Sequence, residues 1–331
     1  MRVQRIAVLC FLVIVSPAHN ATAADKLVGI HSALAISQSL PWIARDAGIF
    51  RKYNLDFDLV LMRSASTAAA AMIGGETDVG LIGGIGILSA YVQGAQDFVI
   101  VGAVKNILTH SIIAKPEIKR PEDLRGKSIG VNRLGSNNHY FAIQVLQRIG
   151  LDPVKDVNFR QTGGDAADLI ALLNGSVDAS AMLTYGQTAV AQGFKYLVYG
   201  PDLRIPYAAA AFVTRRSVIA RKPQVIGQFM HSMAEASKIF HTDKDRTFKI
   251  LAKYLRLNER KILETSYNNE VKAMEPRFDV RPEALQAILD ELAVTDPRAK
   301  KVQPVQLIDR RYVDEMEKSG FFENLWGGKK Q

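Results

Sequence analysis

The sequence predicts an α/β protein built from two related lobes and completed by a helical C-terminal part. First, Gly-x-x-Asp occurs twice in the same context, at Gly75-Glu76-Thr77-Asp78 and at Gly175-Ser176-Val177-Asp178. Second, each copy lies within a series of short apolar segments that alternate with helical patterns, which is typical of parallel sheets covered by helices. Third, this alternation stops near Thr214, and the chain then reads as helical almost to its end.

Each Gly-x-x-Asp copy is predicted to end a helix and to start a strand. Residues 66–73 are rich in alanine, and the glycines that follow can adopt the left-handed conformation that ends a helix without steric cost. Residues 79–82 form an apolar run short enough for a parallel strand that is covered on both faces. Residues 172–183 repeat this arrangement, so we expect two lobes of related topology.

Residues 1–24 are expected to be a secretory signal peptide and are left out of the fold prediction. Two arginines precede an apolar run at 6–15 that is too short to span a bilayer, and Ala21-Thr22-Ala23 offers a cleavage site. The single cysteine, Cys10, lies inside this run without the small residue that normally precedes a lipidated cysteine. Lipid anchoring is therefore not expected, and after cleavage the core alone must stabilise the chain in an oxidising compartment.

The apolar segments after the signal peptide fall into two series. Predicted strands are 26–32, 55–62, 79–82 and 98–104 in the first series, and 127–132, 157–162, 179–183 and 194–199 in the second. Residues 207–214 are predicted to return to the first lobe, followed by helices at 224–240, 246–255, 259–274, 282–292 and 305–318 that pack on it. We assign residues 25–105 and 213–331 to lobe 1 and residues 106–212 to lobe 2, so two crossings form a hinge.

A ligand is expected between the lobes. In open parallel sheets ligands bind beyond the carboxyl ends of the strands, where helix N-termini also point free N–H groups. The segment 132–140 is the most informative loop there, because glycine, a hydroxyl and two amides meet at a predicted helix start. Ser136 or Asn137 either caps this helix or faces the ligand, and the sequence leaves both interpretations open. Gly83 and Gly84 allow close backbone approach to a small ligand.

Three histidines and one lysine near the predicted cleft carry further chemistry. The spacing of His31, His110 and His139 matches no metal motif, so we expect hydrogen bonding to a ligand or structural packing, and no metal or cofactor. Lys105, at a crossing, is a candidate counter-charge for a ligand.

No catalytic or phosphate-binding motif is present in the sequence, which lowers the expectation of an enzyme. The net charge is +9, and the basic residues are scattered among acidic ones. This distribution does not favour nucleic-acid binding.

Four segments of the chain form a recognisable combination. They are the stretch from Ala44-Arg45-Asp46-Ala47-Gly48 to Leu55-Asp56, Gly75-Glu76-Thr77-Asp78-Val79-Gly80, Gly150-Leu151-Asp152-Pro153 and Gly175-Ser176-Val177-Asp178-Ala179. Together they resemble the nitrate/sulfonate/taurine (NMT1/THI5-like, SsuA-like) family of ABC-transporter periplasmic solute-binding proteins. The resemblance implies a two-lobe type II periplasmic binding protein fold that closes on a small, often anionic solute. It also implies location in the periplasm, delivery to an inner-membrane ABC permease and action as a monomer.

The resemblance also places the family's ligand contacts on the loops after the first and third strands and on the helix start of lobe 2. With the cleft residues above, the candidate ligand contacts are Ser32, Ser37, Gln38, Gly83, Gly84, Lys105, Gly135, Ser136, Asn137, His139, Thr184 and Tyr185. Two alternatives stay open, namely a pyrimidine-precursor binding protein or enzyme on the same scaffold, and a periplasmic sensory protein. The pyrimidine synthases of the family carry a cysteine-rich motif that this chain lacks after cleavage.

Overall fold

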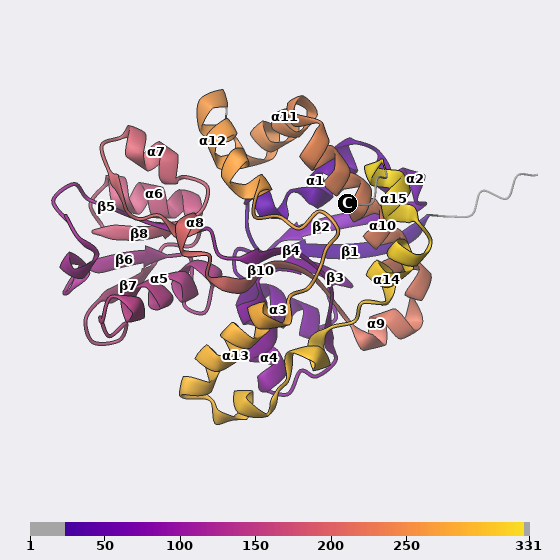
Figure 1. Cartoon of the computed structure of the whole chain (residues 1–331), viewed down its shortest axis with the longest axis horizontal. Helices are drawn as coiled ribbons and strands as arrows, with labels where there is room; N and C mark the ends of the chain where they lie inside the picture. The colour runs from indigo at the N-terminus through magenta and orange to yellow at the C-terminus, as the bar shows by residue number, and fades with distance from the viewer. Residues whose placement is uncertain (1–23, 258, 328–331) are drawn as a thin grey trace, which may run out of the picture.

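The computed structural model describes residues 24–257 and 259–327, which form two lobes with one five-stranded sheet each (Figure 1). This confirms the predicted α/β fold class with two lobes. The expected signal peptide lies, except for its last residue, outside the described part of the chain. Among the described helices, none combines the length and the apolar composition needed to cross a lipid bilayer.

The sheet of lobe 1 is mainly parallel and contains one antiparallel strand. In spatial order its strands are β2 (Leu55–Leu61), β1 (Asp25–His31), β3 (Val79–Ile82), β10 (Pro206–Arg215) and β4 (Phe98–Ile107). Strand β1 pairs in parallel with β2 and β3, whereas β10 runs antiparallel to β3 and β4. The apolar return strand expected from the sequence is therefore β10, and it lies inside the sheet rather than at its edge.

The sheet of lobe 2 repeats this topology. Its order is β7 (Asn158–Gln161), β6 (Ser128–Val131), β8 (Ala179–Met182), β5 (Ser111–Ala114) and β9 (Lys195–Val198). Strand β5 is antiparallel to β8 and to β9, so it occupies the place that β10 has in lobe 1. Strand β5 is not expected from the sequence, because its four residues directly follow the first crossing and lack a neighbouring helix pattern.

The two Gly-x-x-Asp copies form the same structure in both lobes. Asp78 Oδ2 accepts the backbone N–H of Val28 at 3.3 Å, and Asp178 Oδ2 accepts that of Ser128 at 3.0 Å. A lysine also forms an ion pair with each carboxylate. The repeat thus ties β3 to β1 and β8 to β6 where these strands begin, at the sheet edge opposite to the strand ends that face the other lobe.

Helices cover both faces of the lobe 1 sheet (Figure 1). One face carries α1 (Leu40–Asp46), α2 (Ile49–Lys52), α10 (Pro223–Thr242) and α11 (Lys244–Leu255), and the other carries α3 (Ala65–Ile73), α4 (Gly84–Val92) and α13 (Pro282–Thr295). Helices α9 (Arg216–Arg221), α14 (Arg311–Lys318) and α15 (Phe321–Trp326) pack beside α10. The C-terminal helices therefore pack on lobe 1, as predicted.

Lobe 2 has its own shorter helices, and one helix of the C-terminal part contacts both lobes. The helices of lobe 2 are α5 (Asn137–Arg148), α6 (Asp165–Leu173), α7 (Gly186–Ala191), α8 (Gly200–Leu203) and the 3-10 turn η2 (Pro121–Leu124). Helix α12 (Arg260–Val271) contacts α7 of lobe 2 and the 3-10 turn η1 (Ile36–Gln38) of lobe 1. It therefore spans the interlobe cleft on one side.

Two details differ from the sequence-based expectation. The expected lobe boundaries at 105/106 and 212/213 fall inside β4 and β10, and both strands pair within the sheet of lobe 1. We therefore propose residues 108–205 as lobe 2.

The prediction of a single helix at 305–318 is wrong, since the 3-10 turn η4 (Pro304–Leu307) and α14 are separate. Between them the N–H of Asp309 donates to the carbonyl of Ile100 in β4 at 2.9 Å, which interrupts the helix. A further 3-10 turn, η3 (Pro297–Lys301), follows α13.

Candidate functional site

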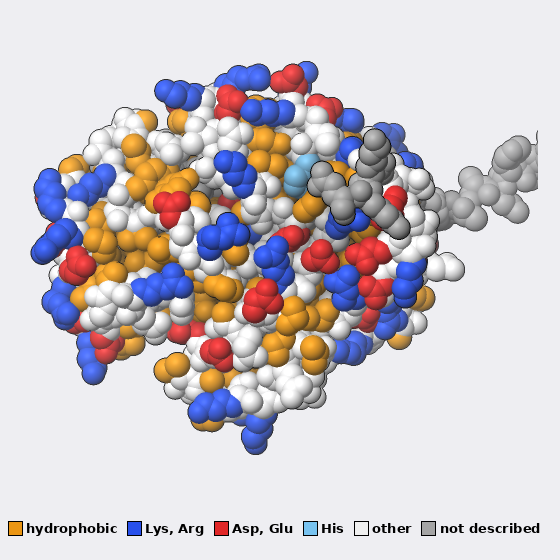
Figure 2. Space-filling view, in the orientation of Figure 1, with side chains coloured by type: hydrophobic (Ala, Val, Ile, Leu, Met, Phe, Trp, Pro, Cys, Tyr) orange, Lys and Arg blue, Asp and Glu red, His pale blue; other side chains and the backbone are white. Residues whose placement is uncertain are grey.

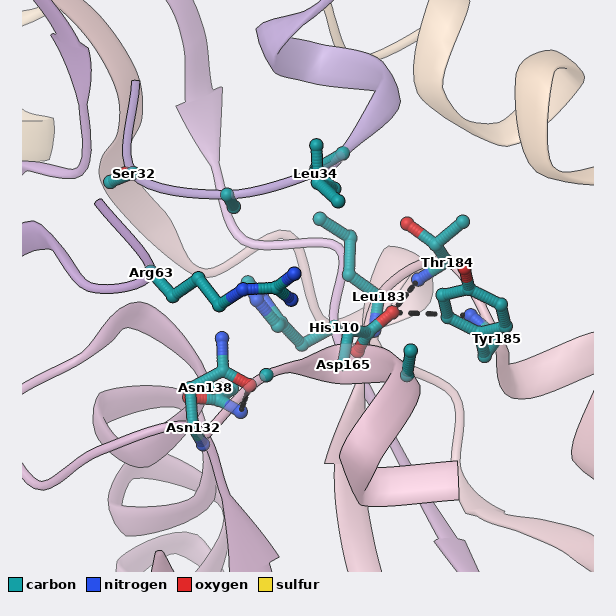
Figure 3. A pocket seen from close by; sticks show the side chains of 14 residues that line it. Ser32, Leu34, Arg63, His110, Asn132, Asn138, Asp165, Leu183, Thr184 and Tyr185 are labelled. Carbon is teal, nitrogen blue, oxygen red and sulfur yellow. Dashed lines mark hydrogen bonds between the residues drawn. The ribbon is translucent and has the colours of Figure 1, made fainter. Parts of the chain in front are cut away.

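A polar cavity lies between the lobes, where the parallel strands of both sheets end. It consists of two adjoining spaces of about 50 and about 40 Å³. Lining residues include Leu34, Arg63, Asp165, Thr184 and Tyr185 in the first space (Figure 3), Ser37, Gln38, Ser64, Lys105, Ser136 and Asn137 in the second, and Ser32, His110, Asn132, Asn138 and Leu183 in both. Spaces of this size hold a few water-sized groups each, so this arrangement of the lobes suits a compact solute.

The loop after β1 presents the Ser32 hydroxyl to the cavity. Gln38 holds this loop, because its Oε1 accepts the N–H groups of Ser32 and Ala33 at 2.8 and 3.0 Å. Its Nε2 donates to Ser32 Oγ at 3.0 Å. Since that oxygen accepts from Gln38, the hydroxyl proton of Ser32 remains available to a ligand. Gln38 therefore positions Ser32, using its carbonyl oxygen and one of its two amide N–H donors.

Arg63 brings a positive charge to the cavity. It follows β2, and its side chain extends across the middle of the pocket (Figure 3). Among residues 24–257 and 259–327 we find no ion pair that involves Arg63. A guanidinium without an ion-pair partner has its five N–H donors available and is well suited to bind an oxyanion. Arg63 is missing from the candidate contacts expected from the sequence.

Asn132, directly after β6, and Asn138, in the first turn of α5, have different tasks. Asn138 Nδ2 donates to Asn132 Oδ1 at 3.0 Å and to the carbonyl of Ala181 at 3.2 Å, while its Oδ1 accepts the N–H of Asn132 at 3.3 Å. Asn138 is therefore engaged at both ends and fixes the loop. Within the described chain the Nδ2 of Asn132 has no acceptor, so it remains free to donate to a ligand. The hydroxyl of Ser136 donates to the carbonyl of Arg133 at 2.6 Å and makes no capping bond.

Asp165 fixes the opposite wall of the cavity. Its carboxylate accepts the N–H groups of Leu183, Thr184 and Tyr185 at 2.9, 2.7 and 3.2 Å (Figure 3). Burial raises the pKa of Asp165, and these three backbone donors act in the opposite direction. The carboxylate thereby holds the segment after β8, which places Thr184 and Tyr185 at the cavity as the sequence analysis expects.

His110 lies at the junction of the two spaces and lines both. Its side chain is buried, with 6% of the residue exposed, and its Nδ1 has no hydrogen-bond partner among the described residues. Burial, and to a lesser extent the charge of Lys105, lower the pKa of His110 to about 3. The ring is therefore neutral near pH 7. The sequence analysis expects this histidine near the cleft but does not include it among the contacts.

Asn137 connects the lobes. Its Nδ2 donates to the carbonyl of Ala209 in β10 at 2.8 Å, and its Oδ1 accepts from the hydroxyl of Tyr207 at 3.1 Å. The side chain also fits against Gly83, where an added Cβ would lie 1.9 Å from Asn137 Oδ1. The side chain of Asn137 from lobe 2 therefore fills the space beside Gly83. From the sequence we expect a ligand, and not a side chain, to approach the backbone at this glycine. Neither Ser136 nor Asn137 caps α5 with its side chain.

Lys105 is not a free counter-charge. Its Nζ donates to Glu270 Oε1 and Oε2 at 3.0 and 2.8 Å and to Thr109 Oγ1 at 2.8 Å. An ammonium group has three donors, so these contacts leave no proton for a solute. Lys105 and Glu270 are both buried. The pair joins β4 and the first crossing to α12, which makes it a structural contact beside the cavity.

Three other candidates lie away from the cavity. A Cβ on Gly84 would be 2.7 Å from Ile288, so this glycine allows α4 to pack against α13. Gly135 and His139 line a separate, mainly apolar groove of about 550 Å³ between α3, α4, α5 and α13, seen as a notch at the lower left of Figure 2. The N–H of Gly135 donates to His139 Nδ1 at 3.0 Å. Burial lowers the pKa of His139 to about 4, so the ring is a neutral acceptor for this loop.

The cavity can therefore bind, orient and enclose a small polar molecule. Its free donors are the Arg63 guanidinium, the Ser32 hydroxyl and the Asn132 amide, and its acid, Asp165, is already bonded to three N–H groups. In the part of the chain that the structure describes, no group of three or more His, Cys, Asp or Glu residues is placed to hold a metal ion. The donors favour an anionic or hydrogen-bond-accepting solute.

Two lobes of equal topology, joined by two crossings and enclosing a polar cavity, define the periplasmic-binding-protein class of fold. The chain belongs to the NMT1/THI5-like family, whose family model matches residues 40–246. A Brucella abortus protein, whose name describes it provisionally as a binding protein, is 26% identical over 241 residues, which are 70% of this chain and 72% of that protein.

Solved structures of similar fold include two solute-binding proteins. The alkanesulfonate-binding protein SsuA of Xanthomonas axonopodis, bound to MOPS, has a TM-score of 0.71 at 20% identity and covers 87% of this chain and 98% of its own. The periplasmic nitrate-binding protein NrtA of Synechocystis has a TM-score of 0.72 at 14% identity and covers 89% of both chains. A DszB mutant in complex with biphenyl-2-sulfinic acid has a TM-score of 0.68 at 13% identity and covers 89% of this chain and 99% of its own. At these identities the likeness defines the fold alone.

Proposed function

We propose that this protein is the periplasmic substrate-binding component of an ABC transporter and that it binds a small anionic solute of the sulfonate, taurine or nitrate class between its lobes. The observation that carries this proposal is Arg63, a cation without an ion-pair partner among the described residues, which extends across the interlobe cavity. The hydroxyl of Ser32 and the amide of Asn132 add donors beside it. Membership in the NMT1/THI5-like family supports a binding function of this kind.

The enclosed position of the cavity suggests how the protein acts. Residues of both lobes line it, so a solute bound there contacts both and stabilises their closed arrangement through its higher affinity for that state. A permease that recognises the closed arrangement would then receive only loaded protein. The proposal treats the protein as a carrier of solute, with no chemical change of the solute.

A thermal-shift panel with purified, ligand-stripped protein tests the proposal. The panel contains nitrate, ethanesulfonate, taurine, small carboxylates and a pyrimidine precursor. A bound solute at a concentration a hundredfold above its Kd adds about 2.7 kcal/mol to the free energy of unfolding, which raises Tm measurably. A pyrimidine as the sole ligand, or turnover of a bound solute, would contradict the proposal.

Replacing Arg63 by methionine tests the charge itself. Loss of a charge-assisted hydrogen bond costs about 1.5–3 kcal/mol, so the affinity for the anion should fall about 10- to 150-fold. Arg160→Met is a matched control, because Arg160 is exposed on β7 and does not line the cavity. Similar losses in both variants would show that net charge, not the site, attracts the solute. The transport role is tested by uptake of the identified solute in cells with and without the gene.

A further inference from the structure

His110 holds hydrogen-bonding capacity that the rest of the protein does not use. Nδ1 is buried without a partner, and within residues 24–257 and 259–327 neither ring nitrogen forms a hydrogen bond. A neutral imidazole has one N–H donor and one acceptor nitrogen. Burying such groups unpaired costs about 1–3 kcal/mol. Nδ1 has almost no accessible surface, whereas Nε2 is not among the buried unpaired atoms of the described residues. Nε2 is therefore the ring nitrogen that a solute in the cavity can reach, and an apolar group against it would bury it unpaired.

The position of His110 says which part of a solute it faces. The first space contains Arg63, whereas the second does not and is lined by polar side chains such as Ser37 and Ser64. His110 lines both spaces, and Figure 3 draws its ring behind the side chain of Arg63. A solute whose anionic head binds Arg63 therefore extends past the imidazole when the rest of the molecule enters the second space.

The neighbouring charged group cannot satisfy His110. Lys105 lines the second space, but its three N–H donors are directed to Glu270 and Thr109. An ammonium offers no acceptor, so it could not take the imidazole N–H either. The remaining partners for His110 are a solute group or a cavity water, and an apolar solute tail would displace that water without replacing its hydrogen bonds.

We propose that His110 selects solutes with a second hydrogen-bonding group, a hydroxyl or an amine, over solutes whose body beyond the anionic head is purely apolar. This inference rests on the proposed function and narrows its substrate class. A site built to hydrogen-bond a substrate group discriminates strongly against the analogue that lacks it, because the polar group of the protein is then left unpaired. The neutral state of the ring allows it to serve a hydroxyl as donor or acceptor and an amine as acceptor.

Calorimetric titration with three sulfonates of similar size tests the selection. The probes are ethanesulfonate, 2-hydroxyethanesulfonate and taurine, with nitrate as an anion that has no second group. We expect the wild-type protein to bind the hydroxyl or amino compound about 5- to 150-fold more tightly than ethanesulfonate, as the cost of an unpaired group predicts. In His110→Leu this preference should disappear, mainly through weaker binding of the polar compound.

The stability of the variant separates selection from folding. Ligand-free His110→Leu should be at least as stable as the wild type, because it removes a buried unpaired polar group. His110→Gln, which keeps a donor and an acceptor, should retain part of the preference and remains informative if the leucine variant does not fold. An unchanged preference in His110→Leu, or tighter binding of ethanesulfonate than of its polar analogues by the wild type, overturns the inference.

The outcomes also distinguish this inference from the proposed function. If nitrate or ethanesulfonate binds in an Arg63-dependent manner and the polar analogues bind no better, anion binding stands and the role of His110 is refuted. If none of the four anions binds the ligand-stripped wild-type protein, the proposed solute class fails and the inference fails with it.

Discussion

Replacement of Gly83 by alanine should weaken solute binding by blocking the closed arrangement of the lobes while leaving lobe 1 folded. A Cβ on Gly83 lies 1.9 Å from Asn137 Oδ1, far inside the ~3.5 Å at which non-bonded heavy atoms pack. Gly83 has φ −77° and ψ 144°, an extended conformation that alanine adopts without strain. The substitution therefore acts on the interlobe contact and not on the local backbone.

The magnitude follows from the contacts that the methyl group displaces. Asn137 makes two hydrogen bonds to lobe 1, with the carbonyl of Ala209 and the hydroxyl of Tyr207. Each contributes about 0.5–1.5 kcal/mol net. Their loss disfavours the closed arrangement by about 1–3 kcal/mol, which corresponds to an affinity about 5- to 150-fold weaker. The radius of gyration of the solute-bound protein should rise in parallel.

The assay combines calorimetric titration of the identified solute with small-angle scattering, and a double-mutant cycle makes it specific. Gly74→Ala is the matched control, because Gly74 has φ −64° and its added Cβ would have no neighbour closer than 3.5 Å. In an Asn137→Ala background, alanine at Gly83 should cost much less, since the clashing amide is gone. Equal losses in both backgrounds, or a lowered Tm of the ligand-free Gly83→Ala protein, would refute the interlobe explanation.

Three further predictions concern ionisable groups. Lys105→Met should lower the free energy of unfolding in urea by about 3–5 kcal/mol, because Glu270 is left buried and unpaired, and the double variant with Glu270→Met should recover much of it. Burial and the nearby Asp165 raise the pKa of Asp168 to about 7, from 3.8. The folded chain thus binds this proton more tightly, so unfolding free energy should fall as pH rises between these values, and Asp168→Asn should remove that slope. Although burial acts in the opposite direction, hydrogen bonds from Ser128 and Lys115 lower the pKa of Asp178 to about 2. Asp178→Asn should therefore lower Tm at pH 7 and leave solute affinity unchanged.

The fold could be predicted largely from local signals. Helix ends at glycine, short buried strands and the duplicated Gly-x-x-Asp are properties of a few consecutive residues, and they locate most elements of both sheets. The exceptions depend on distant partners. Strand β5 is stabilised by pairing with β8 and β9, and the break before α14 depends on a bond to Ile100. A short segment of sequence around β5 or around residues 305–318 does not contain these partners, so neither feature can be predicted from local signals.

The site was predicted at the level of loops and less well at the level of side chains. The loops that meet between the lobes follow from the order of the strands. Ser32, Thr184 and Tyr185, which lie on these loops, line the cavity. The roles of individual residues depend on interlobe neighbours. Asn137 is engaged by lobe 1, and Lys105 is neutralised by Glu270, 165 positions further along the chain. Pairing of this kind leaves no mark on the local sequence, so His110 and Arg63 are recognised only once their surroundings are known.

The placement of β10 inside the lobe 1 sheet has a consequence for biosynthesis. Strands β3 and β4 are joined only through β10, which emerges from the ribosome after the whole of lobe 2. During synthesis both strands therefore present unpaired edges until β10 is made, and such edges can pair with other chains. Lobe 2 is a continuous stretch and can complete its sheet first. We expect this order of folding, and a chain truncated before Pro206 should aggregate through lobe 1 although its other lobe is complete.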